Sequence, residues 1–157
     1  REHTDLPEEL NRIVLAAGLS PSLICLELSE GTVMCHPDKV IPVMRALRCL
    51  GFKIGLDDFG IGQSSLTRLK TLPITSLKID RSFIGGLPQD GGDVAVVRTI
   101  LDLGRHMKLH VMAEGVETDH QLNFLHQFGC IQVQGFMLGR PMPIGDLLRV
   151  RRSLVKI

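Results

Sequence analysis

The chain has 157 residues and 44% hydrophobic content, enough to bury the core of one domain or of part of a larger one. Its 18 Lys and Arg residues nearly balance 17 Asp and Glu residues, which gives a formal net charge of +1. This balance excludes a nucleic-acid polymer as partner and a polybasic membrane anchor. Four cysteines without a C-x-x-C pair argue against a zinc knuckle or a disulfide scaffold and favour reduced thiols.

The sequence has neither a run of about 18 apolar residues nor a signal-peptide pattern. We therefore expect a soluble, cytoplasmic chain, and whether upstream segments tether the parent protein to a membrane stays open. The chain begins at Arg1 instead of Met, which we interpret as a sign that residues upstream are missing.

Helical and strand-like patterns alternate along the chain. Pro7 and Gly18 have the positions typical of helix ends, and Thr118 with Gln121 has capping-box spacing. Short apolar runs predict buried strands, and apolar residues at helical spacing predict amphipathic helices. The predicted elements in chain order are a helix over 7–17, a strand over 23–28, a helix over 40–50, strands over 53–56 and 76–79, a helix over 94–101, a strand over 110–113, a helix over 118–128, a strand over 131–136 and a helix over 144–155.

This alternation predicts an α/β fold with parallel strands, because parallel neighbours need a long helical connection. An open doubly wound sheet and an eight-stranded barrel both satisfy the pattern, and both place their sites at the carboxyl ends of the strands. A complete barrel needs about 250 residues. Five predicted strands therefore fit an open sheet or an incomplete barrel, and composition does not choose between them.

Two adjacent carboxylates, Asp57 and Asp58, follow the predicted strand 53–56 within the motif D-D-F-G. Neighbouring carboxylates repel each other, and a divalent cation such as Mg²⁺ or Mn²⁺ between them removes the repulsion. A solvated turn with an N-capping aspartate is the alternative interpretation of this motif. A kinase interpretation fails because the chain has no H-R-D loop and no G-x-G-x-x-G motif.

Further charged residues interrupt or end the other predicted strands. Glu27 and Lys78 lie inside apolar runs, and Glu114 and Glu117 follow another run in A-E-G-V-E. A carboxylate in a buried strand is costly unless it is paired or binds a metal, although Glu27 could instead face a polar layer or an arginine. Together these residues predict metal-assisted hydrolysis of a phosphate ester, which needs metal ligands, a positioned water and a cation.

Five motifs together resemble the EAL domain family of cyclic-di-GMP phosphodiesterases. They are L-E-L-S-E at 26–30, G-L-D-D-F-G at 55–60, L-K-I-D-R-S-F-I at 77–84, A-E-G-V-E-T at 113–118, and G-C-I-Q-V-Q-G-F with G-R-P-M-P at 129–143. The resemblance implies a modified (β/α)₈ barrel of the TIM type. It also implies hydrolysis of cyclic di-GMP to the linear dinucleotide with Mg²⁺ or Mn²⁺, two ions in the intact domain.

The resemblance assigns roles by motif position. Glu27 and Asp57 resemble metal ligands, and Asp58 resembles a ligand of the second metal. Lys78 is similar to the lysine that orients the attacking water. Glu114 is similar to a glutamate that acts as general base or as an outer-shell metal partner.

The motifs also contain residues with supporting positions. Glu117 matches a second acidic site residue, and Gln134 matches the glutamine of the last strand motif. Glu30 resembles the glutamate that braces the loop after the paired aspartates. The resemblance gives Asp80 a supporting place near the site.

The sequence departs from the family pattern in two ways. The Glu-Ala-Leu signature and the asparagine ligand of the next strand have no counterpart, so we expect residues 1–157 to form a partial domain with about five of eight βα units. In the loop after the paired aspartates, Ile61 and Gln63 replace the usual threonine and tyrosine. In the family this loop couples metal binding to dimerisation, so the replacements put its regulation in doubt.

The resemblance implies a parent phosphodiesterase that binds cyclic di-GMP, an EAL homodimer as its assembly, and an upstream sensory or GGDEF-type domain. With two metal ligands absent, we expect the isolated chain to be inactive, and its unpaired strand edges to favour self-association. A degenerate module that serves as a cyclic-di-GMP receptor or protein-interaction domain is the main alternative. An unrelated open-sheet metal phosphatase is a third.

Overall fold

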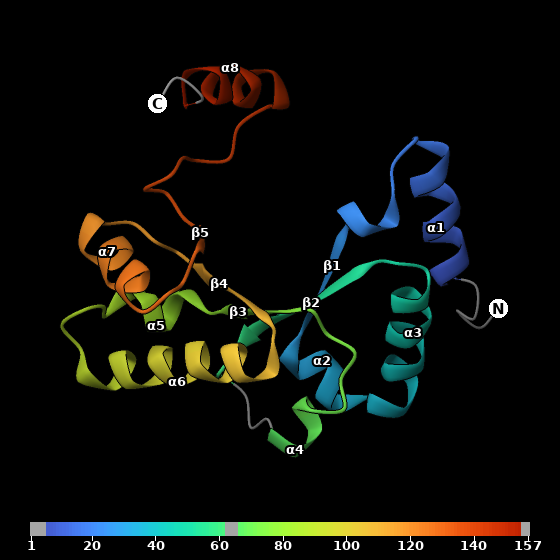
Figure 1. Cartoon of the computed structure of the whole chain (residues 1–157), viewed down its shortest axis with the longest axis horizontal. Helices are drawn as coiled ribbons and strands as arrows, with labels where there is room; N and C mark the ends of the chain where they lie inside the picture. The colour runs from blue at the N-terminus through green and yellow to red at the C-terminus, as the bar shows by residue number, and fades with distance from the viewer. Residues whose placement is uncertain (1–5, 62–65, 155–157) are drawn as a thin grey trace.

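A parallel sheet organises the chain, as the computed structural model shows for residues 6–61 and 66–154. Its five strands pair in the order in which they occur in the sequence (Figure 1). The strands are Cys25–Ser29 (β1), Lys53–Phe59 (β2), Ser76–Ile79 (β3), His110–Glu114 (β4) and Gln132–Gln134 (β5). All four neighbouring pairs are parallel, so every described strand ends at the same edge of the sheet.

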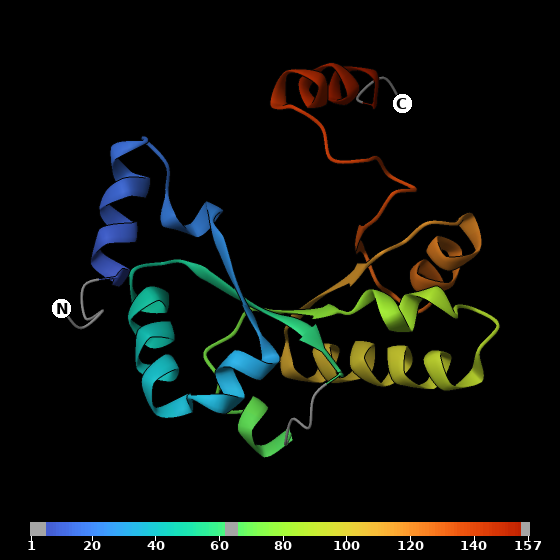
Figure 2. The ribbon, with the colours of Figure 1, turned by 180° about the vertical axis from the view of Figure 1, so that it is seen from behind.

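Helices connect the strands and precede and follow the sheet. They are Leu6–Ala16 (α1), Glu30–Cys35 (α2), Pro37–Cys49 (α3), Leu66–Leu69 (α4), Arg81–Gly85 (α5), Gly91–Met107 (α6), Asp119–Gln127 (α7) and Ile144–Leu154 (α8), with a 3₁₀ turn at Pro21–Leu23. Helices α2, α3 and α6 lie on the same side of the sheet in both ribbon views (Figures 1 and 2). Within the described ranges, no helix combines the length and apolarity needed to cross a membrane.

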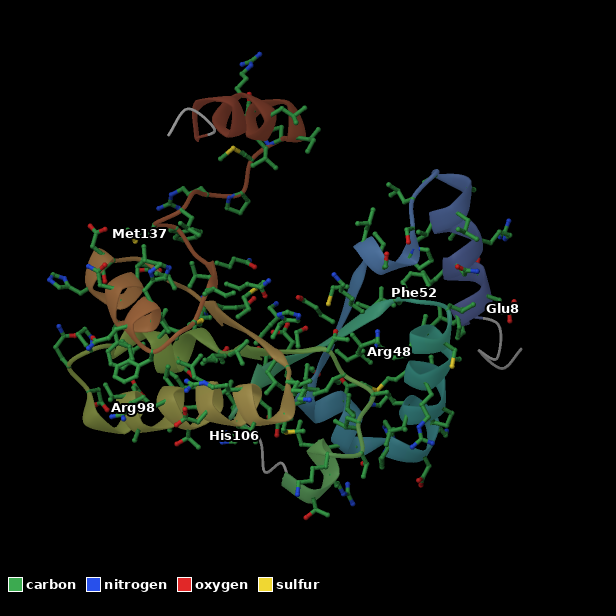
Figure 3. The ribbon with its side chains drawn as sticks, viewed as in Figure 1. Glu8, Arg48, Phe52, Arg98, His106 and Met137 are labelled. Carbon is green, nitrogen blue, oxygen red and sulfur yellow. The ribbon has the colours of Figure 1, made fainter. Side chains whose placement is uncertain are left out.

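The hydrophobic core lies between the sheet and these helices. Ile54, Leu56, Leu77 and Ile79 point toward the helices and are fully buried. Phe52, also fully buried, lies between α3 and β2, where its carbonyl accepts a hydrogen bond of 2.8 Å from Nη1 of Arg48 (Figure 3). Because side chains alternate along a strand, the opposite face of the sheet receives the alternate residues of β2 and β3, which are Lys53, Gly55, Asp57, Ser76 and Lys78. All of these except the glycine are polar.

β2 contains an irregularity at the paired aspartates. Leu56 pairs with Leu77 and Phe59 with Ile79, so three steps along β2 match two steps along β3. Asp58 has the left-handed φ of 56°, which aspartate tolerates better than most residues. This extra residue lets Asp57 face the polar side while Phe59 returns to the core, as expected for a β-bulge.

Every long helix that the sequence predicts is present, but α3 and α6 begin three residues before the predicted residues 40 and 94, and α6 continues to Met107. The capping box at the start of α7 is confirmed. The Thr118 side chain accepts a hydrogen bond from the backbone N–H of Gln121, and the Gln121 side chain accepts one from the N–H of Thr118. Helix α8 stands apart from the other elements in both ribbon views (Figures 1 and 2). Its side chains Ile144, Leu147 and Leu148 are about half exposed or more.

Several predicted boundaries were wrong. The first strand begins at Cys25 instead of residue 23, because Ser20 and Pro21 begin a 3₁₀ turn that includes Leu23. The last strand is limited to Gln132–Gln134, and the second extends through the bulge to Phe59. The short helices α2, α4 and α5 were not predicted. The predicted end of the final helix, Val155, lies outside the described residues.

Candidate active site

Four charged side chains from neighbouring strands meet on the polar face of the sheet. Lys78 stands at the centre, on β3. Its Nζ atom lies 2.7 Å from Oε2 of Glu27, 3.3 Å from Oδ1 of Asp57 and 2.5 Å from Oε1 of Glu114. The three carboxylates come from β1, β2 and β4. We call this set of four residues the Lys78 cluster.

A glycine allows Lys78 to reach the carboxylate two strands away. Gly55 lies opposite Glu27 in the β1–β2 register and opposite Ser76 in the β2–β3 register. A methyl group at Gly55 would lie 3.0 Å from Oγ of Ser76 and 3.5 Å from Cγ of Glu27. Any larger side chain would therefore crowd the path between Lys78 and Glu27. The sequence analysis missed Gly55, although a glycine inside a predicted strand is a signal for close approach.

The charges of the cluster determine the state of Lys78. Its side chain is only 8% exposed, and this burial by itself lowers the pKa of the ammonium group. Hydrogen bonds to Glu114 and Glu27, with the charges of Glu114 and Asp57, act in the opposite direction and raise the pKa well above its ordinary value. Lys78 is therefore a permanent cation at neutral pH. Three carboxylates and one ammonium leave the cluster with a net charge of −2.

The paired aspartates point in different directions. Asp57 joins the Lys78 cluster, whereas Asp58 is exposed and makes no ion pair with another described residue. The backbone N–H of Asp58 donates a hydrogen bond of 3.0 Å to Oδ1 of Asp57. The bulge thus places one carboxylate within the cluster and the other beside it, facing solvent.

Glu30 connects the end of β1 to the loop that follows the aspartates. It begins α2, is 2% exposed, and its Oε2 accepts a hydrogen bond of 3.2 Å from the N–H of Gly60. Its Oε1 is buried without a hydrogen-bond partner among the described residues. The contact has the place expected for a bracing glutamate. Ile61 is 61% exposed, and Gln63 lies outside the described residues.

The other predicted site residues surround the Lys78 cluster without touching its ammonium group. Gln134 ends β5 directly opposite Glu114 and is exposed. Glu117 is exposed, and its backbone N–H donates to Oε1 of Gln121. Asp80 caps α5: burial raises the pKa of its carboxyl group, but hydrogen bonds from Ser82 and from backbone N–H groups outweigh this and lower it. Their roles stay predictions.

Two glycines after the strand ends hold the loops of the site close together. Gly115 has a φ of 76°, and a methyl group there would lie 2.6 Å from Cβ of Arg81. A methyl group at Gly135 would lie 2.0 Å from the carbonyl oxygen of Val116. Both glycines directly follow a predicted site residue in the sequence, which is the signal that could have identified them.

The donor chemistry of the cluster fits a hard divalent cation. Carboxylate oxygens are the ligands that Mg²⁺ and Mn²⁺ prefer, and Glu27 and Asp57 both direct an oxygen at the same cationic centre. The arrangement differs from a metal site in one respect. Among the described residues, no three His, Cys, Asp or Glu side chains are grouped so that they could hold a metal ion directly, and the Lys78 ammonium lies between the carboxylates.

The EAL domain profile matches residues 2–141. The chain is 45% identical over 146 residues to the bifunctional diguanylate cyclase/cyclic di-GMP phosphodiesterase MucR of Pseudomonas aeruginosa, a match that covers 93% of this chain and 21% of MucR. A solved structure of the PaMucR phosphodiesterase with c-di-GMP superposes with a TM-score of 0.87 at 45% identity, covering 92% of this chain and 59% of that one. A manganese and cyclic di-GMP complex of Klebsiella pneumoniae BlrP1 superposes with a TM-score of 0.84 at 33% identity, covering 88% of this chain and 35% of that one.

The chain spans about a fifth of the length of the curated relatives it matches. The superpositions confirm the predicted fold class: the five parallel strands and their helices are part of a TIM-type α/β barrel. They also exclude an unrelated open-sheet phosphatase. A match over residues 2–141 and relatives at this level of identity show that the chain belongs to the EAL domain family.

Proposed function

We propose that this chain contributes the Lys78 cluster to a cyclic-di-GMP phosphodiesterase, which hydrolyses one phosphodiester bond of the ring to give the linear dinucleotide. The convergence of Glu27, Asp57 and Glu114 on Lys78 is the observation that carries the proposal. Two facts support this choice of substrate: MucR is a cyclic di-GMP phosphodiesterase, and the PaMucR and BlrP1 complexes contain cyclic di-GMP.

In the proposed reaction, a water oxygen attacks phosphorus and the bond from phosphorus to a ribose oxygen breaks. The water loses a proton to a side-chain acceptor, and the leaving ribose oxygen takes up a proton from solvent water. Glu114, at the carboxyl edge of the sheet, binds Lys78 through Oε1, and its Oε2 would accept the proton from water. Lys78 remains protonated and would orient the water or stabilise the growing negative charge on a phosphate oxygen.

The reaction would use Mg²⁺ or Mn²⁺. When bound, such ions polarise the phosphate and make water more acidic. Glu27 and Asp57 would hold one ion and Asp58 would contribute to a second, with Glu117 and Gln134 beside them. The BlrP1 complexes with manganese and with calcium support the use of a divalent cation in this family.

The complete site needs more of the domain than this sequence contains. We propose that residues 1–157 supply about five of the eight βα units, and that strands carrying the Glu-Ala-Leu signature and an asparagine supply the remaining ligands. The fact that the match covers 59% of the solved PaMucR chain supports this view. The 157-residue chain alone would then be inactive.

The intact protein would contain further parts. The proposed assembly is an EAL homodimer preceded by a sensory or GGDEF-type domain. The length of the curated relatives, of which this chain covers about a fifth, supports additional domains.

A chimera tests the proposed function. The part of the PaMucR phosphodiesterase chain that precedes the region matched by this chain is fused before the matching residues, and cyclic di-GMP hydrolysis is measured with Mn²⁺. We expect hydrolysis by the chimera, none by the 157-residue chain, and a loss of about 100-fold or more for Glu27→Ala in the chimera. Lys53→Met, an exposed lysine on the same face of the sheet, is the control that keeps activity. A folded chimera that binds cyclic di-GMP without cleaving it would favour the receptor alternative.

A further inference from the structure

A groove lies between α6 and the end of α7. Its larger part has a volume of about 430 Å³ and its smaller part about 180 Å³. Both parts are lined by Leu101, Arg105, Phe128 and Gly129. Arg98 lines the larger part, and Ile131, which precedes β5, lines the smaller one. We call these six residues the α6–α7 groove. It reaches the start of β4 at His110, whereas Glu114 of the Lys78 cluster ends this strand, so the two sites lie at opposite edges of the sheet.

Two arginines of α6 line the groove. Arg98 and Arg105 are separated by seven residues, which is about two turns or 10.5 Å along the helix (Figure 3). The guanidinium carbon of Arg98 lies 4.7 Å from the centre of the Phe128 ring. This stacking holds the cation in place and leaves the N–H groups at its edge available to a carboxylate.

Arg105 can also change its partner. It forms an ion pair of 3.3 Å with Asp102, but both side chains are more than half exposed. An ion pair that is so exposed to water contributes little to stability, so another carboxylate can replace Asp102 at small cost. Asp102 itself would repel an incoming carboxylate.

The groove also offers apolar surface. Leu101 is buried and lies on the same face of α6 as the two arginines, and Phe128 is half-buried. Ile131 is 79% exposed at the end of the groove. A partner that fits this surface must combine carboxylates with apolar side chains.

We propose that the α6–α7 groove binds an acidic amphipathic helix. Two carboxylates of this helix, seven residues apart, pair with Arg98 and Arg105, and an apolar side chain between them packs on Leu101 and Phe128. Charge complementarity and spacing carry the choice. In an extended peptide, residues about 10 Å apart are three positions apart and point to opposite faces, whereas on a helix residues seven apart share a face. This surface is separate from the Lys78 cluster, so the proposal stands or falls without the phosphodiesterase activity.

A synthetic helix tests the proposal. The probe is a fluorescein-labelled, alanine-rich peptide of about 20 residues, long enough to form a helix, with two glutamates seven residues apart and leucines between them. Its binding to the 157-residue chain is followed by fluorescence anisotropy. We expect Arg98→Gln and Arg105→Gln each to weaken binding about tenfold, and Asp102→Asn to strengthen it about threefold. Arg45→Gln, at an exposed arginine of α3 outside the groove, is the matched control and should bind as the unchanged chain does.

The gain expected for Asp102→Asn is a result that misfolding cannot imitate. Unchanged binding by the two arginine variants would overturn the proposal, as would equal binding of a peptide with glutamines in place of both glutamates. A peptide with its glutamates five residues apart, on different faces of the helix, should bind about tenfold more weakly, and equal binding would exclude recognition of a helix.

Two further outcomes would assign the groove to another occupant and overturn the proposal. One is displacement of the peptide by inorganic phosphate at the same concentration, which would identify a site for small anions. The other is self-association of the chain in sedimentation velocity that both arginine variants abolish, which would identify a second copy of this chain as the occupant.

Discussion

The Nζ atom of Lys78 and the Oε1 atom of Glu114 lie 2.5 Å apart and join the neighbouring strands β3 and β4. The Glu114 side chain is 22% exposed and that of Lys78 is 8% exposed. Removing the charge of Glu114 is costly, because the buried ammonium of Lys78 then keeps only its ion pairs with Glu27 and Asp57. The two glutamates of A-E-G-V-E should therefore differ in their effect on stability.

Glu114→Gln should lower the free energy of unfolding by about 1–3 kcal/mol, because a neutral amide replaces the charged partner of Lys78. Glu117→Gln should change it by less than about 0.5 kcal/mol, because the Glu117 side chain is exposed. Urea unfolding of both variants at pH 8 checks the difference. Equal losses would contradict the position given to Glu114.

The raised pKa of Lys78 makes stability depend on pH in the alkaline range. Its pKa in the unfolded chain is about 10.4, and the cluster raises the folded value above this. The extra stability is complete below the unfolded pKa and is lost as the pH rises through the folded pKa. The free energy of unfolding should thus fall more steeply above about pH 10 in the unchanged chain than in Lys78→Met. Urea unfolding at a series of pH values tests this. The control, Lys53→Met, should show the same steep fall of the free energy of unfolding as the unchanged chain.

Much of the fold could be predicted because most of its elements carry a signal within their own segment, such as an apolar run or a capping residue. Ser76–Ile79 is a short apolar run and was predicted without error, and the Thr118 capping box fixed the start of α7. Helices α4 and α5 have four and five residues, too few for an apolar stripe to emerge. The bulge at Asp58 depends on how β2 pairs with β3, which no single segment encodes.

The members of the site could be predicted, but not their contacts. Charged residues inside or after apolar runs identified Glu27, Lys78 and Glu114, because parallel strands end at one edge. The contacts of Lys78 with Glu27, Asp57 and Glu114 follow from the strand register and from the missing side chain at Gly55. Both are properties of the assembled sheet.

The capping box of α7 is a second testable contribution to stability. Thr118→Ala removes the acceptor for the N–H of Gln121 and should lower the free energy of unfolding by about 1 kcal/mol. Gln121→Ala removes the acceptor for the N–H of Thr118 and of Glu117. Since the two side chains act on each other's backbone, the double variant should lose less than the two single losses combined. Thermal unfolding of the three variants measures this coupling, and strictly additive losses would argue against it.

Gly135 should tolerate no side chain. A methyl group there would lie 2.0 Å from the carbonyl oxygen of Val116, so the loops after β4 and β5 would have to separate. Gly135→Ala should lower the free energy of unfolding by about 3 kcal/mol or more. Gly145→Ala is the control, because nothing lies within 4 Å of a methyl group at that position in α8, and it should leave stability unchanged or raise it by up to about 1 kcal/mol. Circular dichroism during urea unfolding distinguishes the two.

Asp58 adopts the left-handed conformation of the bulge and is also the proposed ligand of a second metal ion. Substitutions can separate these two roles. Its φ of 56° is as comfortable for glycine as for aspartate, so Asp58→Gly should change the free energy of unfolding by less than about 1 kcal/mol. Asp58→Val should lower it by about 1–3 kcal/mol, because a β-branched residue is strained at this φ.

If the carboxylate also serves the second metal ion, Asp58→Gly in the MucR chimera should keep the fold and lose about 100-fold or more of its cyclic di-GMP hydrolysis. Asp58→Asn keeps the shape of the side chain and its tolerance of this φ but removes the charge, so it should lose activity as well. Unfolding curves and Mn²⁺-dependent hydrolysis are measured on the same preparations. Full activity in a folded Asp58→Gly chimera would show that Asp58 only shapes the bulge and does not bind a metal ion. Catalysis would then depend on the Lys78 cluster without Asp58.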